Sequence, residues 1–142
     1  MRTVRQLLAG KTAELVTVTP DQPVFEAVRK MDQHGVGAVL VMRGQVLVGI
    51  LSERDYARKV VLLERSSRST RVEQIMTTEV VTVEPQQSVA HCMEVMTRRR
   101  FRHLPVVMEG RVIGVVSIGD LVKAVIEDQQ ADLDALQRYI AS

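Results

Sequence analysis

The sequence predicts a fold of mixed helices and strands (α+β or α/β), built from two β-α-β-β-α repeats that pack with pseudo-two-fold symmetry. Three observations predict this fold. The chain of 142 residues matches itself when it is shifted so that Ser52 meets Ser117. β-Branched runs of strand length alternate with apolar stripes at helical spacing in both halves. One half is too small to bury its sheet alone, so the two halves should pack as one body.

The internal match is dense and needs no gap. Between Val16 and Asp55, eleven residues are identical to the residue 65 places later; composition alone would give roughly three. The identical pairs are Val16/Val81, Thr17/Thr82, Val18/Val83, Pro20/Pro85, Gln22/Gln87, Val24/Val89, Met31/Met96, Val41/Val106, Gly49/Gly114, Ser52/Ser117 and Asp55/Asp120. A weaker echo lies upstream, where Val4–Leu8 resembles Val72–Met76 at a slightly different offset. The chain is therefore two copies of one unit.

The elements of the first copy follow from its pattern. An extended run over residues 15–19 ends at Pro20 and predicts a strand. A stripe of apolar residues at helical spacing then predicts a helix that stops at Gly35. The stripe consists of Val24, Ala27, Val28 and Met31. Two β-branched runs, 38–42 and 46–51, flank a turn signal at 43–45 and predict a hairpin. A second helix is expected from Ser52 to about Leu63.

The second copy repeats this order. Its first helix has an apolar stripe made of Val89, Cys92, Met93 and Met96, and its hairpin turn lies at Glu109 and Gly110. The last helix runs from about Asp120 to near Ile140. Its apolar stripe is longer than one small unit could cover, so part of it is expected to meet another subunit.

The copies define the expected domain organisation. We expect a first repeat over 1–64, a polar linker over 65–71, and a second repeat over 72–142 that ends in the extended helix. Thr70 and Glu73 have the spacing of a capping box for a short helix that carries Ile75 and Met76.

Composition excludes several classes of function. Aromatic residues are only 3% of the chain, so the stacking platforms of single-strand binders are missing. A net charge of +2 suits a small anion better than nucleic acid. The one cysteine rules out an internal disulfide and fits a reducing compartment. No apolar run has the length of a signal peptide or a membrane span. We therefore expect a cytoplasmic protein without a membrane partner.

A short motif suggests chemistry because it occurs twice. Residues 49–55 and 114–120 share the pattern Gly-h-h-Ser-x-x-Asp (h apolar), where a strand runs into a helix. The serine and the first-turn amides favour an anion. The aspartate can accept both hydrogen bonds of a ribose diol, and glycine lets the backbone approach closely. The alternative is a capping box, which Ser-x-x-Asp forms in any soluble protein. The two readings can coexist, and both stay open on the motif alone.

The complete pattern resembles the CBS domain, named after cystathionine β-synthase, twice over. The pattern is Val-Thr-Val-x-Pro, a helix, two strands and Gly-h-h-Ser-x-x-Asp, together with His103–Val107 and Ile75–Thr77. Residues 49–61 and 65–68 look especially like small bacterial and plant-organelle proteins made of a single CBS pair, or Bateman module. The resemblance implies a non-catalytic module for signal transduction that forms a homodimer and acts on a partner protein. It implies AMP, ADP or ATP in clefts between the repeats, and in some members NAD(H) or S-adenosylmethionine.

The family's ligand contacts carry over to matching positions of this chain. Ser52, Asp55, Ser117 and Asp120 would hold ribose and phosphate. Adenine would be lined by the first strands and the entries to the second strands, at Val16, Thr17, Val81, Thr82, Gly37, Ala38, Val39, Arg102, His103, Leu104 and Pro105. Arg54 and Ile118 lie within the two motifs, where Arg54 could reach phosphate. The first copy has Leu40 where the second has Pro105, which predicts unequal affinities.

The remaining residues suggest no catalysis. The run Arg98–Arg102 is either a partial phosphate neutraliser or a solvated face. The three histidines have no metal-ligand spacing, and Cys92 matches Ala27 on the buried stripe. No required cofactor is expected. The rival hypotheses are an NAD(H)-responsive redox sensor that uses the same clefts and a structural dimerisation adaptor without ligand. A DNA-binding regulator is the remote alternative.

Overall fold

The computed structural model describes residues 2–11 and 14–141. The chain forms two compact units: Glu14–Val81 is one, and Met1–Ala13 together with Thr82–Ser142 is the other. These units are offset from the predicted repeats. The N-terminal segment belongs with the second copy, and residues 65–81 belong with the first.

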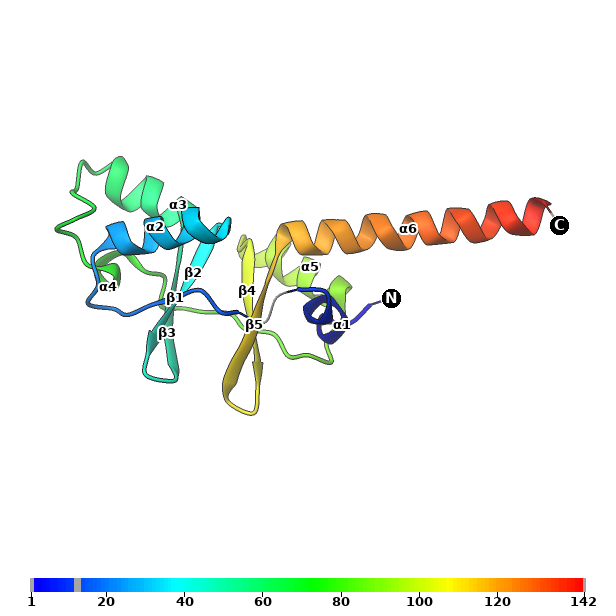
Figure 1. The fold of residues 1–142 in the computed structure, drawn as a ribbon, viewed down its shortest axis with the longest axis horizontal. Helices are drawn as coiled ribbons and strands as arrows, with labels where there is room; N and C mark the ends of the chain where they lie inside the picture. The colour runs from blue at the N-terminus through cyan, green and yellow to red at the C-terminus, as the bar shows by residue number, and fades with distance from the viewer. Residues whose placement is uncertain (1, 12–13, 142) are drawn as a thin grey trace. The chain divides into compact units, whose positions relative to one another are not determined.

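The unit Glu14–Val81 contains a three-stranded sheet and its helices (Figure 1). Its elements are β1 (Thr17–Val18), α2 (Val24–His34), β2 (Ala38–Arg43), β3 (Val46–Ser52), α3 (Glu53–Tyr56), the π-helix η1 (Ala57–Val61) and α4 (Val72–Ile75). Strand β2 is central, parallel to β1 and antiparallel to β3. The predicted helix after Ser52 is thus one α-helical turn followed by a π-helical one.

Helix α2 forms as its apolar spacing predicts. It ends at Gly35, which has a φ of 63° and the left-handed conformation of a helix stop. Its inner face is buried against the sheet in one continuous core. That core consists of Val18, Val24, Ala27, Met31, Val39, Val41, Leu51, Val60, Val72 and Ile75.

The other unit contains a two-stranded sheet. Its elements are α1 (Val4–Ala9), α5 (Val89–Arg99), β4 (His103–Met108), β5 (Arg111–Ser117) and α6 (Ile118–Ala141). The stripe predicted for α5 is wrong at one residue. Met93 is 37% exposed, and Val95 is buried beside Val89, Cys92 and Met96.

The first strand of the second copy does not form. In the first copy, the N–H of Leu40 donates to the carbonyl of Val16 at 3.0 Å and opens the β1 ladder. Pro105 occupies the matching position and has no N–H to donate. Only an isolated parallel bridge between Val83 and Val106 remains, so Val81 and Thr82 lie outside any strand.

The upstream echo corresponds to two equivalent short helices, α1 and α4. Each is joined by its first two amides to the loop before the first helix of its unit. The four bonds are Val4 N to Gln87 O (2.8 Å), Arg5 N to Pro85 O (2.8 Å), Val72 N to Gln22 O (2.8 Å) and Glu73 N to Pro20 O (2.9 Å). These bonds explain why the compact units are offset from the sequence repeats.

Residues 65–71, which the sequence predicts as a polar linker, pack on α2. The N–H of Phe25 donates to the carbonyl of Ser67, and the guanidinium of Arg68 lies 4.1 Å from the Phe25 ring centre. The predicted capping box of Thr70 and Glu73 is wrong. Thr70 is buried, and α4 is capped through Gln74, whose Oε1 accepts from the N–H of Arg71 at 2.7 Å.

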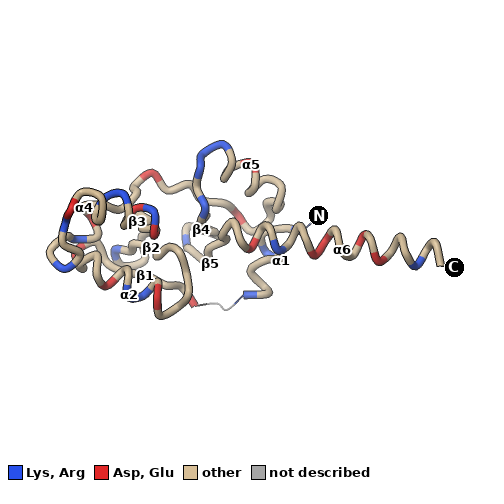
Figure 2. Tube along the Cα trace, turned by 90° about the horizontal axis from the view of Figure 1, so that it is seen from above, with Lys and Arg blue, Asp and Glu red and all other residues tan. Residues whose placement is uncertain are grey.

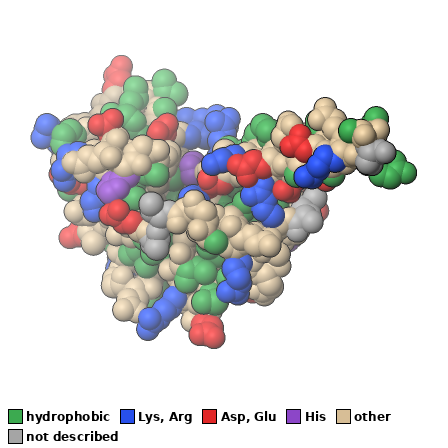
Figure 3. All heavy atoms as spheres, turned by 45° about the vertical axis from the view of Figure 1, so that its right-hand side comes forward, with side chains coloured by type: hydrophobic (Ala, Val, Ile, Leu, Met, Phe, Trp, Pro, Cys, Tyr) green, Lys and Arg blue, Asp and Glu red, His purple; other side chains and the backbone are tan. Residues whose placement is uncertain are grey.

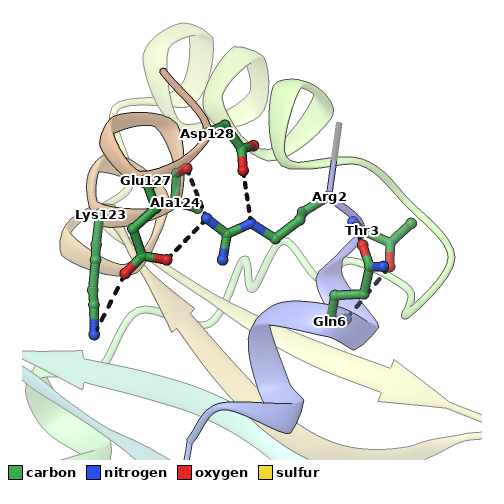
Figure 4. A network of polar contacts seen from close by, with 7 residues as sticks. All are labelled: Arg2, Thr3, Gln6, Lys123, Ala124, Glu127 and Asp128. Atoms are coloured by element: carbon green, nitrogen blue, oxygen red, sulfur yellow. Dashed lines mark hydrogen bonds and ion pairs between the residues drawn. The ribbon is translucent and has the colours of Figure 1, made fainter. Parts of the chain in front are cut away.

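Helix α6 is joined to the N-terminal segment of its own unit by Arg2 (Figure 4). The Arg2 guanidinium donates to the carbonyl of Ala124 at 2.9 Å, to Glu127 at 3.0 Å and to Asp128 at 3.1 Å. The C-terminal part of α6, in which every residue from Gln129 to Ala141 is exposed, projects past the other elements of its unit (Figure 1). No helix in the described residues is both long and apolar enough to cross a membrane.

Candidate functional site

One end of the β1-β2-β3 sheet gathers most residues predicted for the first site. Parallel strands β1 and β2 begin there, and antiparallel β3 ends there. Ala38 is paired with Ser52, and the N–H of Glu53 donates to the carbonyl of Gly37 at 3.0 Å. The predicted residues Val16, Thr17, Gly37, Ala38, Val39, Ser52, Arg54 and Asp55 therefore lie at or beside this end.

The other unit gathers an equivalent set at the end of its β4-β5 sheet. His103 is paired with Ser117, and the N–H of Ile118 donates to the carbonyl of Arg102 at 2.9 Å. The set consists of Thr82, Arg102, His103, Leu104, Pro105, Ser117, Ile118 and Asp120. Val81 belongs to the unit Glu14–Val81 and is not part of this set.

Burial determines which atoms of these residues can contact a ligand. The side chains of Val39 and Leu104 are fully buried. Only their main-chain groups can therefore line an adenine ring. Arg54, Arg102 and Ile118 are exposed, so both guanidinium groups are accessible to an anion.

Both Ser-x-x-Asp motifs form reciprocal helix caps. The Asp55 carboxylate accepts from the N–H of Ser52 at 3.0 Å, and Ser52 Oγ accepts from the N–H of Asp55 at 3.2 Å. Asp120 and Ser117 make the same pair of bonds at 2.8 and 3.2 Å. The capping reading of the motif is confirmed, and the Asp120 carboxylate, with two donors on one oxygen, keeps further acceptor capacity.

The caps also use most of the first-turn amides. In each motif, the amide after the serine donates to the carbonyl just before the paired strand, Gly37 O or Arg102 O, and the amide of the aspartate donates to the serine hydroxyl. The sequence alone predicts that these amides bind an anion. Exposed positive charge at the two sheet ends comes from Arg54 and Arg102.

The carboxylate of Asp55 is held by three neighbours besides its cap amide. The Lys59 ammonium lies 3.0 Å from Oδ1, one helical turn along the chain. The hydroxyls of Ser52 and Thr77 donate to the carboxylate at 3.1 Å and at 3.3 Å. The side chain is 13% exposed. It is therefore well ordered by donors of its own unit.

The carboxylate of Asp120 is held by the N-terminal segment. The Lys11 ammonium donates to Oδ2 at 2.7 Å and also to the carbonyl of Val115 at 2.8 Å. Burial raises the pKa of Asp120, but the hydrogen bond from Lys11, the N–H of Ser117 and the charge of Lys11 outweigh it, so the pKa lies below its ordinary value. The side chain is 25% exposed.

The motif glycines serve packing within each unit. A Cβ at Gly49 would lie 2.6 Å from Met76 Sδ and 3.1 Å from the carbonyl of Thr77. A Cβ at Gly114 would lie 2.7 Å from a methyl group of Leu8. The close approach that the sequence assigned to a ligand is thus made by the segments that contain α4 and α1.

Sequence reasoning missed the three side chains that hold the carboxylates. Lys59 follows Asp55 by four residues, so its helical spacing was a usable signal. Thr77 and Lys11 come from segments that only tertiary contacts bring to the motif. No local pattern identifies them.

The other polar candidates lie elsewhere. Cys92 is fully buried, and burial raises the pKa of its thiol, as expected of a core residue. Figure 2 shows the basic run at the end of α5; Arg98 to Arg100 are exposed there. A hollow of about 470 Å³ lies between α2 and α3, but it is lined by residues outside the predicted set, such as Met31 and Tyr56.

Comparison with known proteins establishes the family. The model of the CBS domain matches the chain twice, at residues 4–62 and 72–127. This chain belongs to the CBS domain family. It is 44% identical over 138 residues to the mitochondrial CBS domain-containing protein CBSX3 of Arabidopsis thaliana, covering 92% of this chain and 67% of the relative.

Solved structures agree with this assignment. A protein with CBS domains from Burkholderia ambifaria superimposes on this CBS pair with a TM-score of 0.87 at 53% identity, covering 90% of this chain and 96% of the other. The CBS domain pair of protein MJ0100, solved with 5′-methylthioadenosine and S-adenosyl-L-methionine, has a TM-score of 0.78 at 22% identity and covers 89% and 98% of the two chains. The latter likeness concerns the fold alone.

Proposed function

We propose that this CBS pair is a non-catalytic sensor that binds an adenine nucleotide at its two Ser–Asp turns and transmits the binding to a partner protein. The observation that carries the proposal is the repeated placement of a serine, an aspartate and an exposed arginine at one end of each sheet. Asp55 and Asp120 would accept hydrogen bonds from the ribose hydroxyls. Arg54 and Arg102 would neutralise the phosphate.

The ligands of another CBS domain pair support adenosine as part of the ligand. The two ligands of the MJ0100 pair, 5′-methylthioadenosine and S-adenosyl-L-methionine, share adenosine and differ beyond the ribose. Recognition of a shared adenosine would use main-chain groups at the strand entries, because Val39 and Leu104 have no accessible side chain. AMP, ADP and ATP are our first candidates because the arginines add positive charge.

Transmission requires that the ligand prefer one arrangement of the protein over another. A nucleotide at Asp120 would compete with Lys11, which comes from the N-terminal segment. Release of that segment is a change that a partner protein could detect. A homodimer and a regulated partner are part of this proposal. The cytoplasmic location stays a prediction, since the similar plant protein is mitochondrial.

Calorimetric titration with AMP tests the assigned roles. Asp120→Ala should weaken binding at its site by about 1.5–3 kcal/mol, on the order of 10- to 100-fold. Ser88→Ala is the matched control, because it removes the N-cap of α5, whose Oγ accepts from the N–H of His91 at 3.0 Å. The control should bind AMP as the wild type does. Unchanged affinity in both Asp55→Ala and Asp120→Ala would refute the roles.

Two alternatives predict different titrations. An NAD(H)-responsive redox sensor would bind NADH in preference to AMP, and a competition experiment would show it. A structural adaptor would bind neither, and no nucleotide would raise its melting temperature. A ligand present at 100 times its Kd should add about 2.7 kcal/mol to the stability.

A further inference from the structure

The projecting part of α6 exposes large apolar side chains. Every residue from Gln129 to Ala141 is exposed, including Leu133, Leu136 and Ile140 at 54%, 54% and 73%. Hydrophobic side chains are visible along this part of the helix among charged ones (Figure 3). Isolated helices shorter than about 12–15 residues are marginal in water, and helices in proteins gain most of their stability from packing of an apolar face.

These side chains follow a coiled-coil spacing. From Val122, successive steps of four and three residues reach Ile126, Gln129, Leu133, Leu136 and Ile140. We call these six residues the α6 seam. The steps alternate as a heptad does, with Ile126, Leu133 and Ile140 at a positions and Val122, Gln129 and Leu136 at d positions. A pattern of period 3.5 keeps one face toward a partner helix along its whole length.

The seam lies opposite the face that α6 uses within its own unit. Leu121 and Ala124 are buried there, at c and f positions of the same heptad. Arg2 binds the carbonyl of Ala124 and the carboxylate of Asp128 on that side (Figure 4). The helix can therefore keep all its internal contacts while a second helix covers the seam.

We propose that the α6 seam packs against the α6 seam of a second copy of this chain, as a parallel two-stranded coiled coil. The seam is self-complementary, and three of its five apolar residues, Ile126 and Ile140 at a positions and Leu136 at a d position, are of the types that favour two parallel strands. Five of its six side chains are large and apolar. Together with Tyr139 at its edge they expose on the order of 700 Å² per copy, which is the most that these side chains could bury and is close to the roughly 800 Å² per partner that a stable interface buries.

Polar residues support the parallel direction. In a parallel pair Gln129 meets Gln129 of the other copy, and the two amides can bond to each other. Asp132, at a g position, then lies across from Gln137 of the other copy. In an antiparallel pair Gln129 would face a leucine, and Asp132 would lie near its own counterpart with like charge. A single polar seam residue that fixes register and direction is a known device of coiled coils.

Sedimentation of the full chain tests the association. The paired change Leu133→Glu and Leu136→Glu should reduce the sedimenting mass at micromolar concentration. Ala131→Glu with Ala135→Glu is the matched control, because it adds the same charge to the same exposed helix at outer positions. Its mass should equal that of the wild type. A monomeric wild type would overturn the proposal.

Disulfide crosslinking tests whether the two α6 seams are in contact. It does so even if copies also associate through another surface, in which case the sedimenting mass alone would not identify the seam. Gln129→Cys should form a linked dimer under mild oxidation, because the two thiols meet across the parallel seam. Ala131→Cys, on the outer face, should not. The native Cys92 is fully buried and does not compete. Absent crosslinking at residue 129, or equal crosslinking at both residues, would overturn the proposal.

Discussion

The turns at Asp55 and Asp120 have the same motif and the same cap, but different second partners. Asp55 is held by Lys59 of its own short helical segment and by Thr77, and is 13% exposed. Asp120 is held by Lys11 of the N-terminal segment and is 25% exposed. The local sequence therefore determines the cap, whereas the tertiary contacts determine how accessible the carboxylate is. A ligand at Asp120 would have to displace a lysine of the N-terminal segment, whereas one at Asp55 would have to displace a lysine of the same helical segment.

The largest expected difference between the copies concerns the motif glycines. Gly49→Ala should destabilise the protein by about 2–3 kcal/mol, because its Cβ would approach both Met76 and the main-chain carbonyl of Thr77. Gly114→Ala should cost about 1 kcal/mol, because the clash is with a side-chain methyl of Leu8 that can rotate away. Urea unfolding measures both changes.

Gly10→Ala provides the control for the glycine pair. A Cβ there would lie 3.7 Å from the carbonyl of Leu7, an ordinary contact, so the free energy of unfolding should barely change. If Gly114→Ala proved more costly than Gly49→Ala, the packing described for the two copies would be wrong.

A second prediction concerns Lys11 as a competitor of the ligand. Lys11→Met should bind adenosine about 2- to 5-fold more tightly at the Asp120 site, since a partly exposed ion pair of about 0.5–1 kcal/mol no longer has to be broken. Adenosine is the right probe because it has no phosphate that Lys11 could attract. Lys59→Met changes the other turn and should leave the affinity of the Asp120 site as it is. Weaker adenosine binding by Lys11→Met in calorimetry would contradict this competition.

The smallest expected effect is a dependence of stability on pH. The folded state lowers the pKa of Asp120 below its ordinary value of 3.8. The ion pair with Lys11 therefore adds stability above that value and loses it as the pH falls through the folded pKa. At pH 7 the free energy of unfolding of the wild type should exceed that of Lys11→Met by about 0.5 kcal/mol, and the gap should narrow as the pH falls below 3.8. If the difference in the free energy of unfolding stayed the same in acid, Lys11 would stabilise the fold by something other than its ion pair with Asp120.

The local part of this comparison could be predicted from the sequence. The internal repeat and the helical spacing of Val24 to Met31 predict the elements, since apolar periodicity is a property of each segment. Gly35 marks the end of α2 for the same reason. The caps at Ser52 and Ser117 were also expected as one of two readings.

The remaining features depend on contacts between distant segments. Pro105 lacks the N–H that its counterpart Leu40 donates to Val16. This loss matters because the bond from Leu40 helps to pair β1 with β2, and that pairing is a tertiary contact. Lys11 and Thr77 reach the carboxylates from positions just after α1 and α4, outside the aligned residues 16–55 and 81–120. Residues 65–71 resemble a linker in composition but pack on α2 through Arg68 and Phe25. The roles of the predicted nucleotide-binding residues stay a prediction.

The central claim is that Asp55 and Asp120 grip a ribose in addition to capping a helix. The most direct test compares calorimetric Kd values of AMP and 2′,3′-dideoxy-AMP on two proteins, the wild type and the double variant Asp55→Ala/Asp120→Ala. The wild type should bind AMP about 10- to 100-fold more tightly than the dideoxy compound, and the double variant should bind both alike. Equal discrimination by the two proteins would show that the carboxylates do no more than cap their helices.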